Sequence, residues 1–324
     1  MFPIHINFGA MRHRLAAALV SAALLAASSA ILAAESKQKV FATPEEAAKA
    51  LVAAVKAADK KAMLQILGPG AKAIVESGDA VSDKQAGERF TKAYEDANKL
   101  EKSGDAKAVL SVGKDGWPFP IPIVKGDKGW SFDTNAGKEE VLNRRIGRNE
   151  LSTIQVLQAY VDAQREYYLR NPQGDKLMHY AQKFESSPGK KDGLYFPVKA
   201  GEMQSPLGPL VTGAKAEGYG KNGKTGKRAP YHGYRFRILT GQGPDAPGGA
   251  YSYVANGKMI GGHAVVAWPD QYGNSGVMTF IINQDGVVYE KDLGPETATA
   301  VQKITRFNPD KSWKKEEPKA SAKK

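Results

Sequence analysis

The chain contains no cysteine and only five histidines. The absence of cysteine excludes disulfide bonds, thiolate catalysis and zinc sites built from cysteine. His179, His232 and His263 are the histidines that follow residue 34, and their spacing matches neither H-x-x-x-H nor H-x-H. Because a metal site requires histidines that converge with a carboxylate, we expect no metal site and interpret all three histidines as structural.

Long apolar runs are also scarce: residues 15–34 form one without any charge, and nothing similar follows. The run comes after a basic cluster at residues 12–14 and ends in small residues, the order found in a signal peptide. We therefore expect residues 1–34 to be a signal peptide, cleaved near Ala33/Ala34, and the mature chain to be periplasmic or secreted with no transmembrane segment. The alternative is a retained membrane anchor, since about 20 apolar residues can span a bilayer.

Basic residues outnumber acidic ones, and the formal net charge is +12. Loss of the two arginines in the signal leaves +10, and the segment from residue 311 to residue 324 holds six of the lysines. A basic exported protein is suited to an anionic envelope polymer or an envelope protein as its partner. The competing interpretation is a solvated surface with a disordered, lysine-rich tail.

The periodicity of the apolar residues predicts an α+β fold. Thr43 is the expected N-cap of the first helix, and Ser82 or Asp83 is expected to cap a later helix that carries Leu100. A small antiparallel meander follows, then a helical section, then a mainly antiparallel β part. The expected sections are an N-terminal α+β module at 41–136, a helical section at 137–187, a β module at 188–300 and a basic, disordered tail at 301–324.

Two turn signals and three prolines refine this prediction. Asn256-Gly257 and Asp285-Gly286 are expected to form type I′ hairpin turns, in which both central residues have positive φ. Pro118, Pro120 and Pro122 alternate along one predicted strand and remove its hydrogen-bond donors, so that strand must lie at an edge or outside a ladder. The Asn-Pro pair at residues 171–172 is expected to end the long helix.

Several long stretches of the chain are distinctive: RRIGRNE at 144–150, AYVDAQREY at 159–167, DGLY at 192–195, YVANGKMIGG at 253–262 and YGNSGVMTF at 272–280. Together they closely resemble the uncharacterised bacterial family known as domain of unknown function 2950. The resemblance extends from about Phe41 to Gly294 and implies export and a shared architecture. It supplies no activity and no catalytic residues. The order of elements in the first module also resembles that of NTF2-like modules.

Residues 218–225 match the Walker A string G-x-x-x-x-G-K-S/T letter for letter. A phosphate-binding loop of this kind needs a buried strand before it and a helix after it. The flanking residues, AKAE and GKRAP, predict neither element. We therefore expect no bound nucleotide and no cofactor.

Aromatic residues cluster in the β module around a Gly/Pro-rich loop at 241–249, and loops of this kind on a rigid sheet often bind partners. The candidate binding residues are Tyr231, Tyr234, Tyr251, Tyr253, Trp268 and Tyr272. The competing interpretation is that these aromatics are core. The sequence lacks a set of acid, base and nucleophile, which favours a non-catalytic binding or assembly module of the cell envelope. The alternatives are a hydrolase of an envelope polymer that uses a carboxylate or His263, and a basic surface-coating protein.

Overall fold

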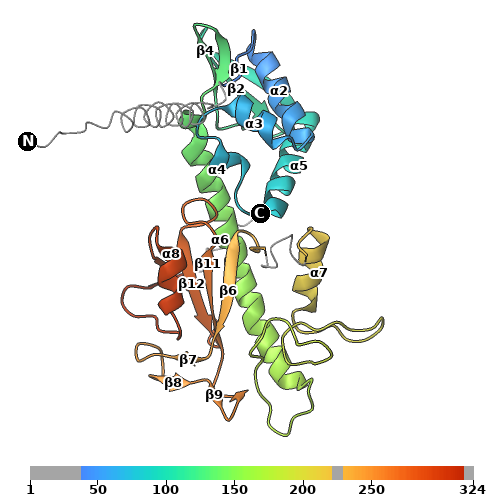
Figure 1. The fold of residues 1–324 in the computed structure, drawn as a ribbon, viewed down its shortest axis with the longest axis vertical. Coiled ribbons are helices and arrows are strands. Elements are labelled where there is room, and N and C mark those ends of the chain that lie inside the picture. Colours follow the sequence, from blue (N-terminus) through green and yellow to red (C-terminus); the bar gives the residue numbers. More distant parts are fainter. Residues whose placement is uncertain (1–37, 221–228, 317–324) are drawn as a thin grey trace, which may run out of the picture.

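The computed structural model describes residues 38–220 and 229–316. The expected signal peptide, residues 1–34, lies outside the described residues, as do residues 221–228, with most of the Walker-like string, and residues 317–324. In the described part of the chain, no helix is both long enough and apolar enough to cross a membrane. The architecture is α+β, as predicted, with two bodies that share one long helix (Figure 1).

Four helices begin the first body: α2 (Pro44–Lys56), α3 (Lys60–Leu67), α4 (Lys72–Val75) and α5 (Ala80–Asp96). Thr43 caps α2 as predicted, because its hydroxyl accepts a hydrogen bond from the Glu46 N–H. The predicted cap of α5 is wrong. Asp79 is the N-cap, while the Asp83 carboxylate points back and accepts the N–H of Ser77.

The first body contains an antiparallel sheet with the strand order β1-β2-β4-β5 and with β3 paired to β2. Its strands are β1 (Asn98–Ser103), β2 (Lys107–Val112), β3 (Trp117–Pro118), β4 (Ile123–Gly126) and β5 (Gly129–Phe132). Leu100 lies in β1 rather than in a helix, because α5 ends at Asp96 and Ala97 is extended. Pro120 and Pro122 fall between β3 and β4, outside any ladder, as expected.

Helix α6 (Thr134–Arg170) leaves the first body and runs along the second (Figure 1). Its 37 residues correspond to a length of about 55 Å at 1.5 Å per residue. The Asp133 carboxylate caps the first turn by accepting the Ala136 N–H. Asn171 adopts the left-handed conformation at φ 43° and ends the helix, so the predicted end is confirmed.

The second body is built on an antiparallel sheet with the order β14-β13-β12-β11-β6. Its strands are β6 (Tyr234–Leu239), β11 (Ala264–Pro269), β12 (Met278–Asn283), β13 (Tyr289–Asp292) and β14 (Lys314–Lys315). There are also two separate two-stranded sheets. One pairs β7 (Gly241–Gln242) with β8 (Tyr251–Ser252), and the other pairs β9 (Val254–Ala255) with β10 (Lys258–Met259). The helical elements here are α7 (Gly208–Ala216), α8 (Thr297–Ala300) and the 3-10 turn η1 (Val301–Lys303).

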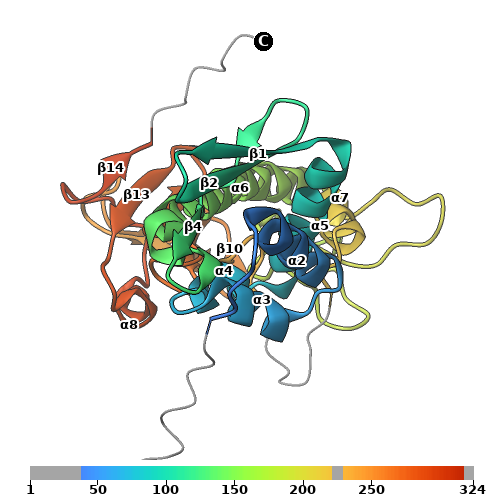
Figure 2. The ribbon, with the colours of Figure 1, turned by 90° about the horizontal axis from the view of Figure 1, so that it is seen from above.

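Strand β11 is apolar throughout because both of its faces are buried. Val265 and Ala267 pack in one core with Leu157 of α6, while Ala264 and Val266 pack in another with Phe307. Figure 2, viewed along α6, shows α8 and β13–β14 on one side of the helix and α7 on the other. The sheet therefore separates two apolar cores.

The turns and the C-terminal segment differ in part from expectation. Asn256 and Gly257 have φ of 50° and 75°, as a type I′ turn requires. The same prediction is wrong for Asp285, which is not among the residues with positive φ, because the connection between β12 and β13 is longer than two residues. The disorder expected after residue 300 is also wrong as far as residue 316, since this segment carries η1 and β14 and buries Phe307 to 1% exposure.

Candidate functional site

Two of the predicted binding aromatics are core residues. Tyr234 and Tyr253 are both 0% exposed. The Tyr234 hydroxyl donates to the Met278 carbonyl oxygen at 2.9 Å, and the Tyr253 hydroxyl donates to Gln242 Oε1 at 3.0 Å. Burial with a satisfied hydroxyl is the usual arrangement of a structural tyrosine.

The other four predicted aromatics are partly or fully exposed, and the structure does not gather them into one site. Tyr231 precedes β6, Tyr251 lies on β8, Trp268 on β11, and Tyr272 in the connection between β11 and β12. The Trp268 ring packs 5.6 Å from the guanidinium of Arg237. Because the four residues belong to four different segments, the fold places their rings apart.

The structure does bring together two of the distinctive sequence stretches. Asn149 of α6 donates its side-chain amide to the Ser275 carbonyl oxygen at 2.9 Å. Glu150 Oε1 accepts the N–H groups of Val277 and Met278, each at 3.0 Å. The RRIGRNE stretch on α6 therefore holds the YGNSGVMTF stretch that leads into β12.

Arg145, in the same stretch of α6, ties three segments together. Its guanidinium donates to the carbonyl oxygens of Ala73 and Ile74 at 2.6 and 2.5 Å, and to Asn274 Oδ1 at 2.6 Å. The Asn274 amide in turn donates to the Glu76 carbonyl oxygen at 3.2 Å. Burial lowers the pKa of Arg145 from its usual range, but an arginine stays charged in proteins. The two bodies are thus joined by more than the continuity of α6.

Asp79 provides a second connection between the bodies. Asp79 is 1% exposed, and its carboxylate accepts four hydrogen bonds. Oδ1 accepts from the N–H groups of Val81 and Ser82, whereas Oδ2 accepts the Tyr219 hydroxyl at 2.7 Å and the Gly233 N–H at 3.0 Å. Burial and then the Asp79 carboxylate raise the pKa of Tyr219, which keeps this hydroxyl a donor.

A cleft of about 800 Å³ opens at this junction, between α3, α4, the start of α6 and the β11–β12 connection. Its charged and amide-bearing lining residues are Lys60, Lys72, Glu76, Asp83, Lys138, Gln271 and Asn274. Asn274 and the neighbouring backbone of α4 are fixed by Arg145, so the walls of the cleft are held in place by the network described above. The cleft is therefore preformed.

The balance of charge in the cleft is positive. The Lys60 ammonium lies 3.8 Å from a Glu76 carboxylate oxygen, but no carboxylate of the described residues lies within 4.0 Å of Lys72 or Lys138. Burial raises the pKa of Asp83, although hydrogen bonds from Ser77 and the charge of Arg145 oppose this effect. Two cations that lack a partner within the described residues remain available to an anionic ligand.

Sequence reasoning missed this site. Lys60, Lys72 and Lys138 lie in separate, ordinary helical stretches, and each appears solvated when the sequence is read alone. The available signal was the pair of adjacent arginines in the RRIGRNE stretch, of which Arg145 proves to bond the backbone of α4 and Asn274 beside the cleft.

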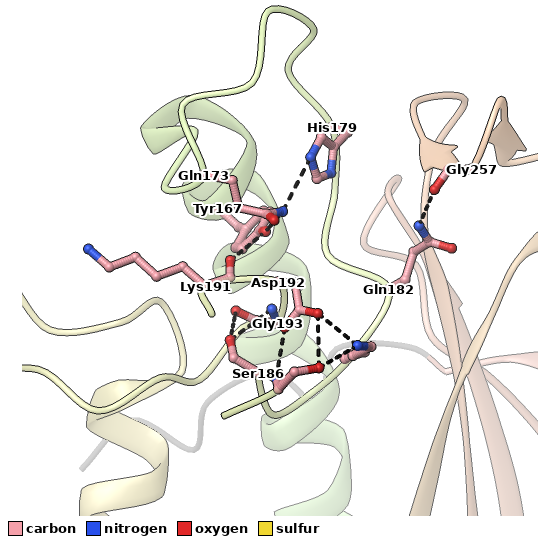
Figure 3. A network of polar contacts seen from close by, with 11 residues as sticks. Tyr167, Gln173, His179, Gln182, Ser186, Lys191, Asp192, Gly193 and Gly257 are labelled. Atoms are coloured by element: carbon pink, nitrogen blue, oxygen red, sulfur yellow. Dashed lines mark hydrogen bonds and ion pairs between the residues drawn. The ribbon is translucent and has the colours of Figure 1, made fainter. Parts of the chain in front are cut away.

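A second polar network lies at the opposite end of α6 (Figure 3). The Tyr167 hydroxyl donates to the Lys191 carbonyl oxygen at 2.8 Å and accepts from Gln173 Nε2 at 2.9 Å. Nearby, Gln182 Nε2 donates to the Gly257 carbonyl oxygen at 2.8 Å. These bonds fasten the long irregular segment after α6 to the helix and to the β9–β10 hairpin.

His179 belongs to this network and has no free ring nitrogen. Nδ1 lies 3.0 Å from the Tyr180 carbonyl oxygen, and Nε2 lies 2.8 Å from Asp175 Oδ2, which also receives Lys258 Nζ at 2.6 Å. Lys258 and then His179 hold the pKa of Asp175 below its usual range. Within residues 38–220 and 229–316, no three His, Asp or Glu side chains converge on a position for a metal ion.

His263, the residue considered for a hydrolase, is a core residue with 2% exposure. The rings of Tyr160 and Tyr180 meet it edge-on, with centroids 5.4 and 4.8 Å away. Burial lowers the pKa of His263 to about 3, and Arg165 adds to the shift. A substrate in solvent cannot reach this ring in the structure.

The burial of His263 predicts a pH-dependent stability. Its folded pKa of about 3 lies below the unfolded value of about 6.5, so its contribution is complete above pH 6.5 and is lost as the pH falls towards 3. We expect His263→Leu to flatten the dependence of unfolding free energy on pH between 6.5 and 4 by up to ~1.4 kcal/mol per pH unit. Urea denaturation at several pH values measures this slope. An unchanged slope in the variant would contradict the assignment.

The fold and the junction define an α+β protein in which a single long helix joins two bodies and helps to frame a basic cleft. The chain belongs to the DUF2950 family, described as "Protein of unknown function", whose family model matches residues 38–316. The resemblance inferred from the sequence stretches is thereby confirmed. No curated protein and no solved structure matches the chain.

Proposed function

We propose that the protein is an exported binding module of the cell envelope, and that the cleft at the junction of its two bodies holds an extended, acidic segment of an envelope polymer. The observation that carries the proposal is the preformed cleft of about 800 Å³ with Lys72 and Lys138 on different walls, neither paired with a carboxylate of the described residues. Export rests on the leader at residues 1–34, with its basic cluster and apolar run.

The geometry favours an extended ligand over a compact one. Lys60 begins α3, Lys72 begins α4, and Lys138 lies in the first turns of α6, so the ammonium groups come from three separate elements along the cleft. A chain with repeated negative charges can contact several of them at once. Because Arg145 and Asp79 already fix the walls, little conformational entropy is lost when the ligand binds.

The competing function is hydrolysis of such a polymer in the same cleft. The observation in its favour is Asp83, whose raised pKa would suit a general acid, with Glu76 as a second carboxylate in the lining. However, the Asp83 carboxylate already accepts the Ser77 N–H with both oxygens. We therefore place binding first. If the protein cleaves such a polymer and Asp83→Asn abolishes the cleavage, hydrolysis replaces binding as the proposed function.

Charge reversal in the cleft tests the proposal. We expect Lys72→Glu/Lys138→Glu to weaken binding of dextran sulfate at least tenfold, because two attractive contacts become repulsive. Affinity is measured by calorimetry at fixed salt concentration, with neutral dextran as the matched polymer. The expected affinity for dextran is below detection in both proteins.

The control variant carries the same change of charge away from the cleft. Lys114→Glu/Lys128→Glu alters two exposed lysines in turns of the first body's sheet. We expect its affinity for dextran sulfate to stay within threefold of the unaltered protein. Equal losses in both variants would favour the surface-coating function and contradict a specific cleft.

A further inference from the structure

A smaller pocket of about 340 Å³ lies in the second body, on the side of the sheet away from α6. It is bounded by the Gly/Pro-rich loop after β7, by β13 and by the segment that follows η1. Ile281, Leu293, Ile304 and Trp313 give it apolar walls, and Lys303 and Arg306 stand among its polar lining residues. Its position is separate from the cleft at the junction, with which it shares no lining residue.

Most polar groups of the pocket are already used within the protein. Asn308 and Asp245 hold each other through two hydrogen bonds of 2.8 Å. Asp310 accepts the Ser312 N–H at 2.8 Å, and Lys291 Nζ donates to the Ser312 hydroxyl at 2.6 Å. These bonds fix the rim, and they use one of the three N–H donors of the Lys291 ammonium.

Two cations remain. No carboxylate of the described residues lies within 4.0 Å of Lys303, and the same is true of Arg306, whose Nη1 donates only to the Gln242 carbonyl oxygen at 3.3 Å. A guanidinium has five N–H donors, so most of those on Arg306 are left for an anion. Apolar walls beside unpaired cations suit a ligand with an acidic head and an apolar body.

We infer that this pocket binds a small amphiphilic carboxylate, with the carboxylate at Lys303 and Arg306 and the apolar part against Ile304 and Trp313. The rim is preformed, since a Cβ at Gly243 would come within 2.4 Å of Asn308 Oδ1, and the glycine lets these two segments touch. The inference does not depend on the function of the cleft.

The test uses three probes with the full mature chain. Octanoate combines both features of the ligand, acetate has the charge without the chain, and octan-1-ol has the chain without the charge. By calorimetry, octanoate is expected to bind at least tenfold more tightly than either of the other two. The failure of octanoate to bind, or equal affinity for octan-1-ol, would overturn the inference.

Variants locate the site. Lys303→Gln/Arg306→Gln is expected to weaken octanoate binding at least tenfold, and Trp313→Ala to a similar extent.

The matched control is Lys311→Gln/Lys315→Gln, which removes two positive charges from the same segment outside the pocket and is expected to change affinity less than threefold. Lys72→Glu/Lys138→Glu should leave octanoate binding intact, which separates the two sites. Unchanged octanoate affinity in Lys303→Gln/Arg306→Gln would place the ligand elsewhere and reject the pocket.

Discussion

Replacing Asp79 with alanine is expected to lower the free energy of unfolding by about 3–7 kcal/mol. The loss of an N-cap costs about 1 kcal/mol. In addition, the Tyr219 hydroxyl and the Gly233 N–H each lose a buried acceptor, at about 1–3 kcal/mol per group. Urea denaturation followed by circular dichroism measures the change.

Asp59→Ala provides the control for this prediction, because Asp59 caps α3 through a single, exposed hydrogen bond to the Ala62 N–H. Its loss is expected to cost only about 1 kcal/mol. Asp79→Asn should fall between the two alanine variants, since its amide keeps one acceptor oxygen but turns an NH₂ towards the remaining donors. If Asp79→Ala were no more damaging than Asp59→Ala, the connection to Tyr219 would contribute nothing.

Replacing Arg145 with alanine should lower the unfolding free energy by about 2–4 kcal/mol, because two backbone carbonyl groups and Asn274 lose a charged donor. The same change also loosens one wall of the cleft, so we expect weaker dextran sulfate binding even at temperatures where the variant is folded. Arg145→Lys should recover only part of the stability, since an ammonium cannot reproduce the planar geometry of a guanidinium.

The adjacent residue gives a matched control. Arg144 bonds the exposed Glu140 one turn away and packs over the Trp117 ring at 4.8 Å. Arg144→Ala is expected to cost about 0.5–1.5 kcal/mol from these two contacts. Equal effects of Arg144→Ala and Arg145→Ala would indicate that the junction does not hold the two bodies.

Features set by local chemistry could be predicted from the sequence. The Thr43 cap, the end of α6 at Asn171 and the Asn256-Gly257 turn each depend on a few adjacent residues. The choice among possible caps for α5 could not be predicted, because Asp79, Ser82 and Asp83 are all suitable residue types. It is decided by Tyr219 and Gly233, more than 130 residues away.

The candidate sites depend on contacts between distant segments, and this is why they escaped prediction. The predicted aromatics of the β module come from different strands and connections, and the fold sends Tyr234 to one core, Tyr253 to another and the remaining rings to separate places. The many lysines after residue 300 led to a prediction of disorder, so Arg306 and Trp313 were not considered as candidate site residues. The Gly/Pro-rich loop borders the smaller pocket through Gly243 and Pro244, but none of the six predicted aromatics is among the residues that line it.

The two bodies differ in how far apart in the chain their core residues lie. The buried core of the first body draws only on residues from Phe41 to Phe132, whereas that of the second joins Leu157 of α6 to Val288. Because a chain is synthesised from its N-terminus onward, the first set is complete while the second is still unfinished. The first body can therefore fold as it emerges, and α6 then offers its C-terminal half as a surface on which the later strands assemble.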